Sequence, residues 1–261
     1  MVNPRRLFRL LVPAIGWSLL LAFVLSATPS YDMDLHVDYD DGTFQGQVTV
    51  EYVNDTGHAQ NLVLFRLFGN DPLFGTARVI VTEVAVEGRE RPYQMFSDDT
   101  VLLVELDASL PPEERLMVQL TFRGAAERWM ETSAPSLRGS GLLTRSESSM
   151  TLSGFYPMLA VYGPNGWDLN PSPGFGDVIM AEASDYTVRV TTRSGLRVVG
   201  PCQPSSDAAQ GESATYQFSA PNLREFSVVL LDSASYTVSS RQVDGVEVRS
   251  IFRRDNSVAA D

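Results

Sequence analysis

The residues Tyr31–Tyr52 read YDMDLHVDYDDGTFQGQVTVEY, and this stretch decides the fold class. Apolar and polar side chains alternate on both sides of Asp41-Gly42, a dipeptide typical of a two-residue turn. The alternating positions are Met33, Leu35, Val37 and Tyr39 before the turn and Phe44, Gly46, Val48, Val50 and Tyr52 after it. A period of two belongs to strands with one buried face, so the stretch predicts an antiparallel hairpin.

The same pattern extends through the rest of the chain. Leu62–Phe68 is almost continuously apolar, as expected for a strand that is covered on both faces. Further strands are predicted at Arg78–Val86, Val101–Leu106, Leu116–Phe122, Tyr186–Thr192, Arg197–Val199, Ala214–Ser219, Glu225–Leu231, Ser235–Ser239 and Val246–Phe252. No amphipathic helix longer than two turns follows residue 27. We therefore expect an all-β fold, either a large antiparallel β-sandwich or a curved, saddle-like sheet.

Turns and loops separate these strands. Asn54-Asp55-Thr56-Gly57 reads as a turn, and although Asn54 also heads a glycosylation sequon, a turn explains these residues without a sugar. Ala125–Ser149 and Pro201–Glu212 lack periodicity and are expected to be exposed loops, the first with one short helical turn around Glu127–Met130.

Aromatic residues and turn formers are concentrated in Leu152–Val190. The aromatic residues are Phe155, Tyr156, Tyr162, Trp167, Phe175 and Tyr186, interspersed with glycine and proline. Such ordered loops suit two roles: they seal one end of a large β domain, or they form a rim that meets a ligand. Composition alone favours the sealing role.

The order of motifs in this stretch carries a resemblance. The motifs are Gly154-Phe155-Tyr156-Pro157, Leu159-Ala160-Val161-Tyr162, Gly166-Trp167, Gly176-Asp177, and Glu182 followed by Asp185-Tyr186. They resemble the N-terminal β domain that precedes the catalytic domain in the bacterial branch of the aminopeptidase N-like zinc metallopeptidases. Leu110–Phe122 and Ala220–Val228 resemble two further segments of that domain. The resemblance implies that residues 31–254 form this domain and that residues 255–261 begin the connection to an absent catalytic domain.

The resemblance also implies where the chemistry lies. In the family, a later domain holds the zinc helix, His-Glu-x-x-His, and a Gly-x-Met-Glu-Asn strand that grips the amino terminus of the substrate. Neither motif occurs in this sequence. We therefore expect the chain alone to be inactive and to hold no cofactor. Its partners would be the absent catalytic domain, which would carry the zinc, and the peptide substrate of the parent protein, which by this resemblance is expected to be an aminopeptidase.

Three residues are candidates for a wall of the substrate cleft: Tyr156, Trp167 and Glu182. A carboxylate that faces the cleft could pair with the ammonium group of a peptide. Glu182 aligns with the acidic residue of an Asp-Glu-Pro stretch in the family, but Ala181 and Ala183 replace its neighbours. An ordinary loop carboxylate is the alternative interpretation of Glu182.

Other catalytic arrangements find little support in the sequence. The chain has only two histidines, His36 and His58, and no Gly-x-Ser-x-Gly elbow. Cys202 is the single cysteine, so the chain cannot form an internal disulfide. We assign no catalytic or metal-binding residue. The competing hypothesis is a free-standing exported β-sandwich that binds a protein or a carbohydrate through its aromatic residues.

The amino terminus and the net charge indicate the compartment and exclude one class of partner. Arg5, Arg6 and Arg9 precede the apolar run of residues 10–27, so residues 1–27 are expected to be a hydrophobic leader helix. This leader is either a cleaved signal peptide or an uncleaved signal anchor, and only the anchor would contact a membrane. The rest of the chain is expected outside the cell or at its surface. A net charge of -12 argues against nucleic-acid binding.

Overall fold

The structure is a computed structural model that describes residues 28–128, 141–173 and 176–255. The predicted leader of residues 1–27 lies outside the described residues, as do residues 256–261 of the predicted connection. Among the described residues, no helix has the length and apolar character needed to cross a bilayer.

The largest sheet has eight strands. In spatial order these are β17 (Ser206–Gln210), β18 (Ser213–Leu223), β15 (Ser184–Arg193), β1 (Ser30–Asp38), β2 (Thr43–Val53), β8 (Arg115–Ala125), β4 (Arg78–Val86) and β5 (Arg89–Glu90). Neighbouring strands run antiparallel except β1 and β15, which pair in parallel from Ser30 and Asp185 onward.

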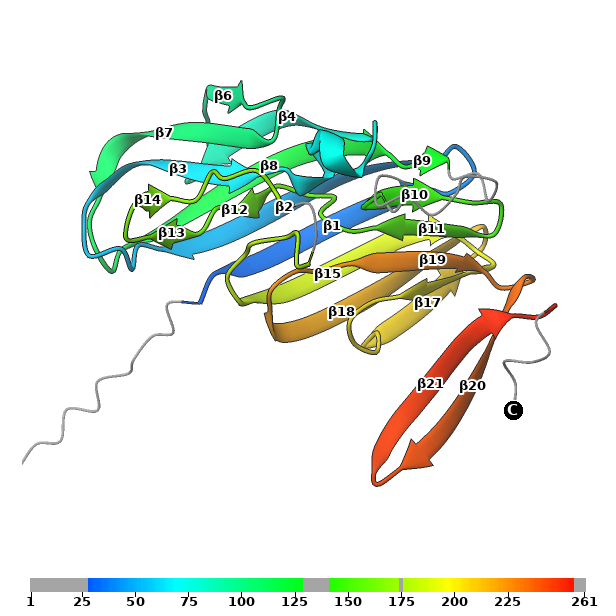
Figure 1. Cartoon of the computed structure of the whole chain (residues 1–261). Coiled ribbons are helices and arrows are strands. Elements are labelled where there is room, and N and C mark those ends of the chain that lie inside the picture. Colours follow the sequence, from blue (N-terminus) through cyan, green and yellow to red (C-terminus); the bar gives the residue numbers. More distant parts are fainter. Residues whose placement is uncertain (1–27, 129–140, 174–175, 256–261) are drawn as a thin grey trace, which may run out of the picture.

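Smaller sheets and short elements cover one face of the large sheet (Figure 1). One small sheet has the order β16 (Leu196–Val199), β19 (Val228–Asp232), β11 (Ser149–Leu152), β10 (Leu143–Arg145) and β9 (Glu127–Arg128). Another has the order β12 (Met158–Leu159), β3 (Gln60–Arg66), β7 (Val101–Leu110) and β6 (Tyr93–Phe96). The remaining elements are the 3₁₀ turns η1 (Phe68–Asn70) and η2 (Pro72–Phe74) and the strand pairs β13 (Tyr162–Gly163) with β14 (Gly166–Trp167) and β20 (Tyr236–Val243) with β21 (Val246–Arg253).

The core lies between the large sheet and its covering sheets. Val48 from the large sheet, Phe65 and Leu102 from one small sheet, and Met150 and Leu230 from the other are fully buried in one continuous apolar cluster. Because the central strands of the large sheet have one buried and one exposed face, apolar residues alternate along them, as on β1. The predicted all-β fold is confirmed.

Aromatic rings pack over glycines inside the large sheet. Phe44 on β2 lies opposite Gly124 on β8, and Phe122 lies opposite Gly46. A Cβ atom added to Gly124 would lie 2.4 Å from the Cζ atom of Phe44. Glycine is therefore required at this position because the neighbouring ring occupies the space of a side chain.

The first hairpin is confirmed, but its turn is longer than predicted. β1 ends at Asp38, which pairs with Thr43, so residues 39–42 form the loop in place of Asp41-Gly42 alone. Tyr39 leaves the strand ladder because its ring is buried beneath the guanidinium of Arg193, 5.2 Å from the ring centroid. The backbone N–H of Asp41 donates to the Asp38 carboxylate and closes the loop.

Both predicted long loops contain strands. β17 lies within Pro201–Glu212 and pairs with β18 at the edge of the large sheet. Of the predicted helical turn Glu127–Met130, Glu127 and Arg128 form strand β9, which pairs in parallel with β10, and residues 129–130 lie outside the described residues. Both faces of β17 are exposed, so this strand shows no alternation of apolar residues.

Candidate functional site

The pairing of β1 with its two neighbours determines which residues meet at one end of the large sheet. β15 runs parallel to β1, so the start of β15 lies beside the start of β1. β2 runs antiparallel to β1, so its last residues lie at the same end, where Ser30 pairs with both Glu51 and Asp185. Glu182, which precedes β15, is therefore brought near the end of β2.

A cluster of acidic and aromatic residues, which we call the acid–aromatic cluster, occupies this end of the sheet. Its members are Tyr52 at the end of β2, Asp55 in the following turn, Tyr162 and Trp167 on the β13–β14 pair, and Glu182. The Trp167 ring lies 6.1 Å from the Tyr52 ring and 5.2 Å from the Tyr162 ring, centroid to centroid. The structure therefore places two of the three predicted site residues, Trp167 and Glu182, around Tyr52.

The surroundings of Glu182 and Tyr52 in the cluster disfavour the charged forms of these two side chains. Partial burial of its carboxylate raises the pKa of Glu182 above its ordinary value, and the nearby Asp55 raises it further. Burial likewise raises the pKa of the Tyr52 hydroxyl, with Asp55 and Glu182 adding to the effect. Both carboxylate residues remain accessible to solvent, and within the described residues neither forms an ion pair.

Two polar atoms of the cluster lack hydrogen-bond partners. The Tyr52 hydroxyl and the Trp167 indole Nε1 are both buried, and neither has a partner among the described residues. Buried polar groups are nearly always satisfied, so these two atoms mark the cluster as a place where the packing of the described residues leaves polar groups unpaired. Two unpaired carboxylates beside aromatic rings suit a cation such as a primary ammonium.

A buried asparagine holds the turn that carries Asp55. Asn54 is 0% exposed, and its amide Nδ2 donates to the backbone oxygens of His58 and Leu110, each at 2.8 Å. Its Oδ1 accepts from the hydroxyl of Thr56 at 2.7 Å. The side chain is therefore fully engaged inside the fold, which confirms the turn interpretation of this sequon.

Arg66 on β3 holds the loop that follows Trp167. Its guanidinium is buried, donates from Nη1 to the backbone oxygen of Asn170 at 2.8 Å and lies 4.9 Å from the centroid of the Phe68 ring. Burial lowers the pKa of Arg66, while Asp168 and Asp71 oppose that shift. This residue therefore fixes the position of the β13–β14 pair relative to the core.

Tyr156, the third predicted site residue, lies inside the core. It is 0% exposed, its hydroxyl donates to the Tyr186 hydroxyl at 3.1 Å, and the backbone N–H of Phe226 donates to it at 3.1 Å. Phe155 and Tyr186 are also buried, which confirms the sealing role for this part of Leu152–Val190. Tyr156 is inaccessible to solvent in the described chain. It could therefore affect a cleft only indirectly, by supporting the residues that pack on it.

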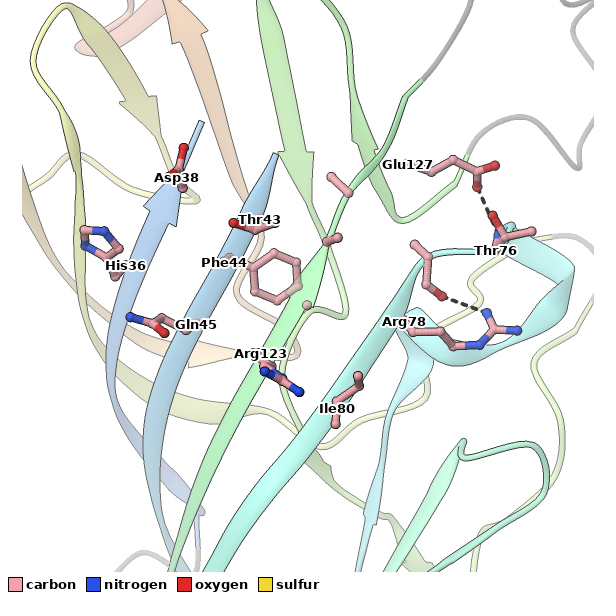
Figure 2. A pocket seen from close by; sticks show the side chains of 14 residues that line it. His36, Asp38, Thr43, Phe44, Gln45, Thr76, Arg78, Ile80, Arg123 and Glu127 are labelled. Atoms are coloured by element: carbon pink, nitrogen blue, oxygen red, sulfur yellow. Dashed lines mark hydrogen bonds between the residues drawn. The ribbon is translucent and has the colours of Figure 1, made fainter. Parts of the chain in front are cut away.

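A recess lined by His36, Gln45, Arg78 and Arg123, among others, lies on the uncovered face of the large sheet, and we call it the outer hollow (Figure 2). It has a volume of about 780 Å³. Arg123 has no ion-pair or hydrogen-bond partner in the described chain, and Arg78 donates only to the backbone oxygen of Ala77. A neighbouring hollow of about 500 Å³ shares His36, Gln45 and Arg123 with it. These amide, imidazole and guanidinium groups can donate hydrogen bonds to hydroxyl or anionic groups.

The histidines lie in separate surroundings. His36 on β1 lines the outer hollow, whereas His58 lies exposed in the turn held by Asn54. Among the described residues, no group of three or more histidine, cysteine, aspartate and glutamate side chains could hold a metal ion.

Sequence reasoning missed Tyr52 and Asp55. Tyr52 was predicted only as an inward residue of a strand, and Asp55 only as part of a turn. Their proximity to Glu182 depends on the parallel pairing of β1 with β15, which joins distant parts of the chain. No local pattern could have revealed it.

Comparisons with known proteins give structural matches alone. No family model and no curated protein matches the sequence. The structure is similar to an M1 zinc metallopeptidase from Deinococcus radiodurans, with 14% identity, a TM-score of 0.56 and coverage of 87% of this chain and 47% of that one. It is equally similar to a two-domain M1 zinc metallopeptidase variant bound to L-tryptophan, with 14% identity, a TM-score of 0.57 and coverage of 89% and 51%.

The chain has the fold of a β domain of the M1 zinc metallopeptidases. The sequence resemblance to the aminopeptidase N-like enzymes is therefore confirmed at the level of the fold. The chain spans about half the length of these solved M1 structures, and this extent is consistent with an N-terminal domain.

Proposed function

We propose that this chain is the non-catalytic N-terminal domain of an exported zinc metallopeptidase, in particular an aminopeptidase, and that it forms one wall of the substrate cleft. The fold match and the order of motifs in Leu152–Val190 support the family. The basic and apolar leader of residues 1–27 supports export, as a signal peptide or a signal anchor. In this proposal the zinc and the zinc-activated water belong to the catalytic half, which is not part of this sequence.

The acid–aromatic cluster is the observation that supports the proposed wall. The amino terminus of a peptide is a primary ammonium, and the cluster offers it the carboxylates of Glu182 and Asp55 without competing ion pairs. The rings of Trp167 and Tyr162 supply apolar contact for the first side chain of the peptide. Exclusion of water by the catalytic half would strengthen the attraction between the ammonium and the carboxylates.

The coding region downstream of residue 261 provides the first test. A reading frame that continues into Gly-x-Met-Glu-Asn and His-Glu-x-x-His motifs would support the proposal, and a stop codon would refute it. In the full-length enzyme, Glu182→Gln should raise KM for a peptide substrate about 10-fold with little change in kcat, because a hydrogen bond to the charged ammonium is lost. Trp167→Ala should also raise KM, because the apolar contact with the first side chain of the peptide is lost. Tyr156 is unsuitable for this test because its removal would disturb the core. Unchanged kinetics in both variants would contradict the wall assignment.

The outer hollow favours a second candidate function, a free-standing exported module that binds carbohydrate or protein. Three of its lining groups, Gln45, His36 and Arg123, can donate hydrogen bonds to the hydroxyl groups of a sugar. Calorimetry of the chain against a panel of neutral and acidic oligosaccharides tests this function. Binding that is lost in Arg123→Ala and Gln45→Ala would favour it over the peptidase proposal.

A further inference from the structure

The hairpin of β20 and β21 projects away from the rest of the domain (Figure 1). Its two strands pair with each other from Tyr236 and Arg253 to Val243 and Val246, and in the described chain they join no other sheet. Asp244 and Gly245 form the connecting turn, with φ angles of 49° and 82°. Positive φ at both central residues is typical of the tight turns that match the twist of a hairpin.

The two faces of the hairpin differ in their surroundings. Val238, Arg249 and Ile251 share one face, and they line a small recess against β16 and the turn around Cys202, so this face is directed toward the body of the domain. The opposite face carries Val243, Val246, Val248 and Phe252, and we call it the valine face. The valine face therefore points away from the domain core.

The valine face is unusually exposed for apolar side chains. Val243 is 46% exposed, Val246 63% and Val248 53%. A two-stranded hairpin is marginally stable in water unless a further strand or a packed layer covers it. Val243 and Val246 pair across the two strands, and Val248, which pairs with Arg241, lies next to them on the same face. This exposed apolar group at the tip of the hairpin therefore indicates a contact that the described chain does not contain.

The charge of the hairpin contrasts with that of the chain. Residues 236–255 contain four arginines, Arg241, Arg249, Arg253 and Arg254, against three acidic residues, Asp244, Glu247 and Asp255, the last of which pairs with Arg253. The whole chain has a net charge of -12. An apolar surface with acidic residues at its margin would complement the arginines of this hairpin better than a second copy of the hairpin would.

We infer that the valine face packs on the catalytic half of the parent enzyme and that β20 and β21 extend a sheet of that half. This inference rests on the proposed function. The solved M1 structures are about twice as long as this chain, so a second body of similar size is available to cover the hairpin. The hairpin then belongs structurally to both halves, and it fixes the orientation of the acid–aromatic cluster relative to the catalytic centre.

The test compares the full-length enzyme with the chain of residues 28–261. Backbone amides of β20 and β21 should exchange with solvent at least about 10-fold more slowly in the full-length enzyme. The double variant Val246→Ser and Val248→Ser should lower the Tm of the full-length enzyme by several degrees and leave that of the isolated chain unchanged. Met117→Ser is the matched control, because Met117 is 48% exposed on the uncovered face of the large sheet. It should leave both Tm values unchanged.

The other possible outcomes distinguish a failure of the proposed function from a failure of this inference. A downstream frame without the zinc motifs refutes the proposed function, and the inference falls with it. A frame with these motifs, combined with equal exchange rates in the two proteins and no effect of the double variant, overturns the inference while the proposed function stands. An isolated chain that dimerises, and that becomes monomeric in the double variant, assigns the valine face to self-association and also overturns the inference.

Discussion

The hydroxyl of Tyr156 donates a hydrogen bond to the hydroxyl of Tyr186 at 3.1 Å, and both rings lie inside the core. The Tyr156 oxygen also accepts from the backbone N–H of Phe226. Tyr156→Phe therefore leaves a buried N–H without a partner, and we expect it to reduce the free energy of unfolding by about 1–3 kcal/mol.

Tyr186→Phe is the control for this prediction. It removes the acceptor of the Tyr156 hydroxyl but leaves the bond from Phe226 intact. Measured by denaturant-induced unfolding, Tyr186→Phe should therefore reduce the free energy of unfolding less than Tyr156→Phe does. Equal or reversed costs would contradict the role of Tyr156 as the acceptor for the backbone.

Asn54→Ala should destabilise the chain by roughly 2 kcal/mol or more, because the backbone oxygen of Leu110 and the neighbouring turn lose their buried donor. The exposed turn residue Asn165 supplies the comparison, and Asn165→Ala should stay within about 0.5 kcal/mol of the wild type. Mass spectrometry of protein from a glycosylating host should find Asn54 unmodified. A glycan at Asn54 would contradict its burial.

Glu182→Gln should change the pH dependence of stability. Because the folded state raises the pKa of Glu182, it favours the neutral acid, and the associated stability is present below the unfolded pKa of about 4.3 and is lost as pH rises through the folded pKa. Glutamine stays neutral, so the variant should match the wild type near pH 3 and have a higher Tm at pH 7. Glu90→Gln, at an exposed position on β5, is the control. A Tm difference that is the same at both pH values would contradict the assigned cause.

Gly124→Ala should destabilise the large sheet by about 1–3 kcal/mol, because its Cβ would lie 2.4 Å from Phe44 and 2.8 Å from the backbone oxygen of Arg78. Gly163→Ala is the matched control, since no atom lies within 4 Å of a Cβ at that position. Denaturant titration of both variants measures the difference. A neutral Gly124→Ala would show that the ring of Phe44 moves aside without cost.

The sequence predicted strands well where one or both faces of a strand are buried. The alternation in β1 and the continuous apolar run of β3 follow directly from burial. β9 and β17 were missed because their residues are exposed and only backbone pairing holds them in strands. Pairing between backbones leaves no pattern in the side chains.

The site was only partly predictable for a related reason. The motif order identified Trp167 and Glu182, and the structure brings both near Tyr52. Tyr156 came from the same motifs but lies in the core, because an aromatic residue next to a turn former is equally common in a packed end cap and in a rim. Its hydroxyl bonds could not be foreseen without the position of Phe226.

The parallel pairing of β1 with β15 constrains how the chain can mature. β1 lies in the middle of the large sheet, yet its second neighbour is not synthesised until residues 184–193 have been made. Until then one edge of β1 is open, and an open edge invites pairing with other unfinished chains. Pairing of β1 with β15 should therefore limit the folding rate. A ribosome-bound or partly translocated chain would need a chaperone for longer than a chain built only from hairpins.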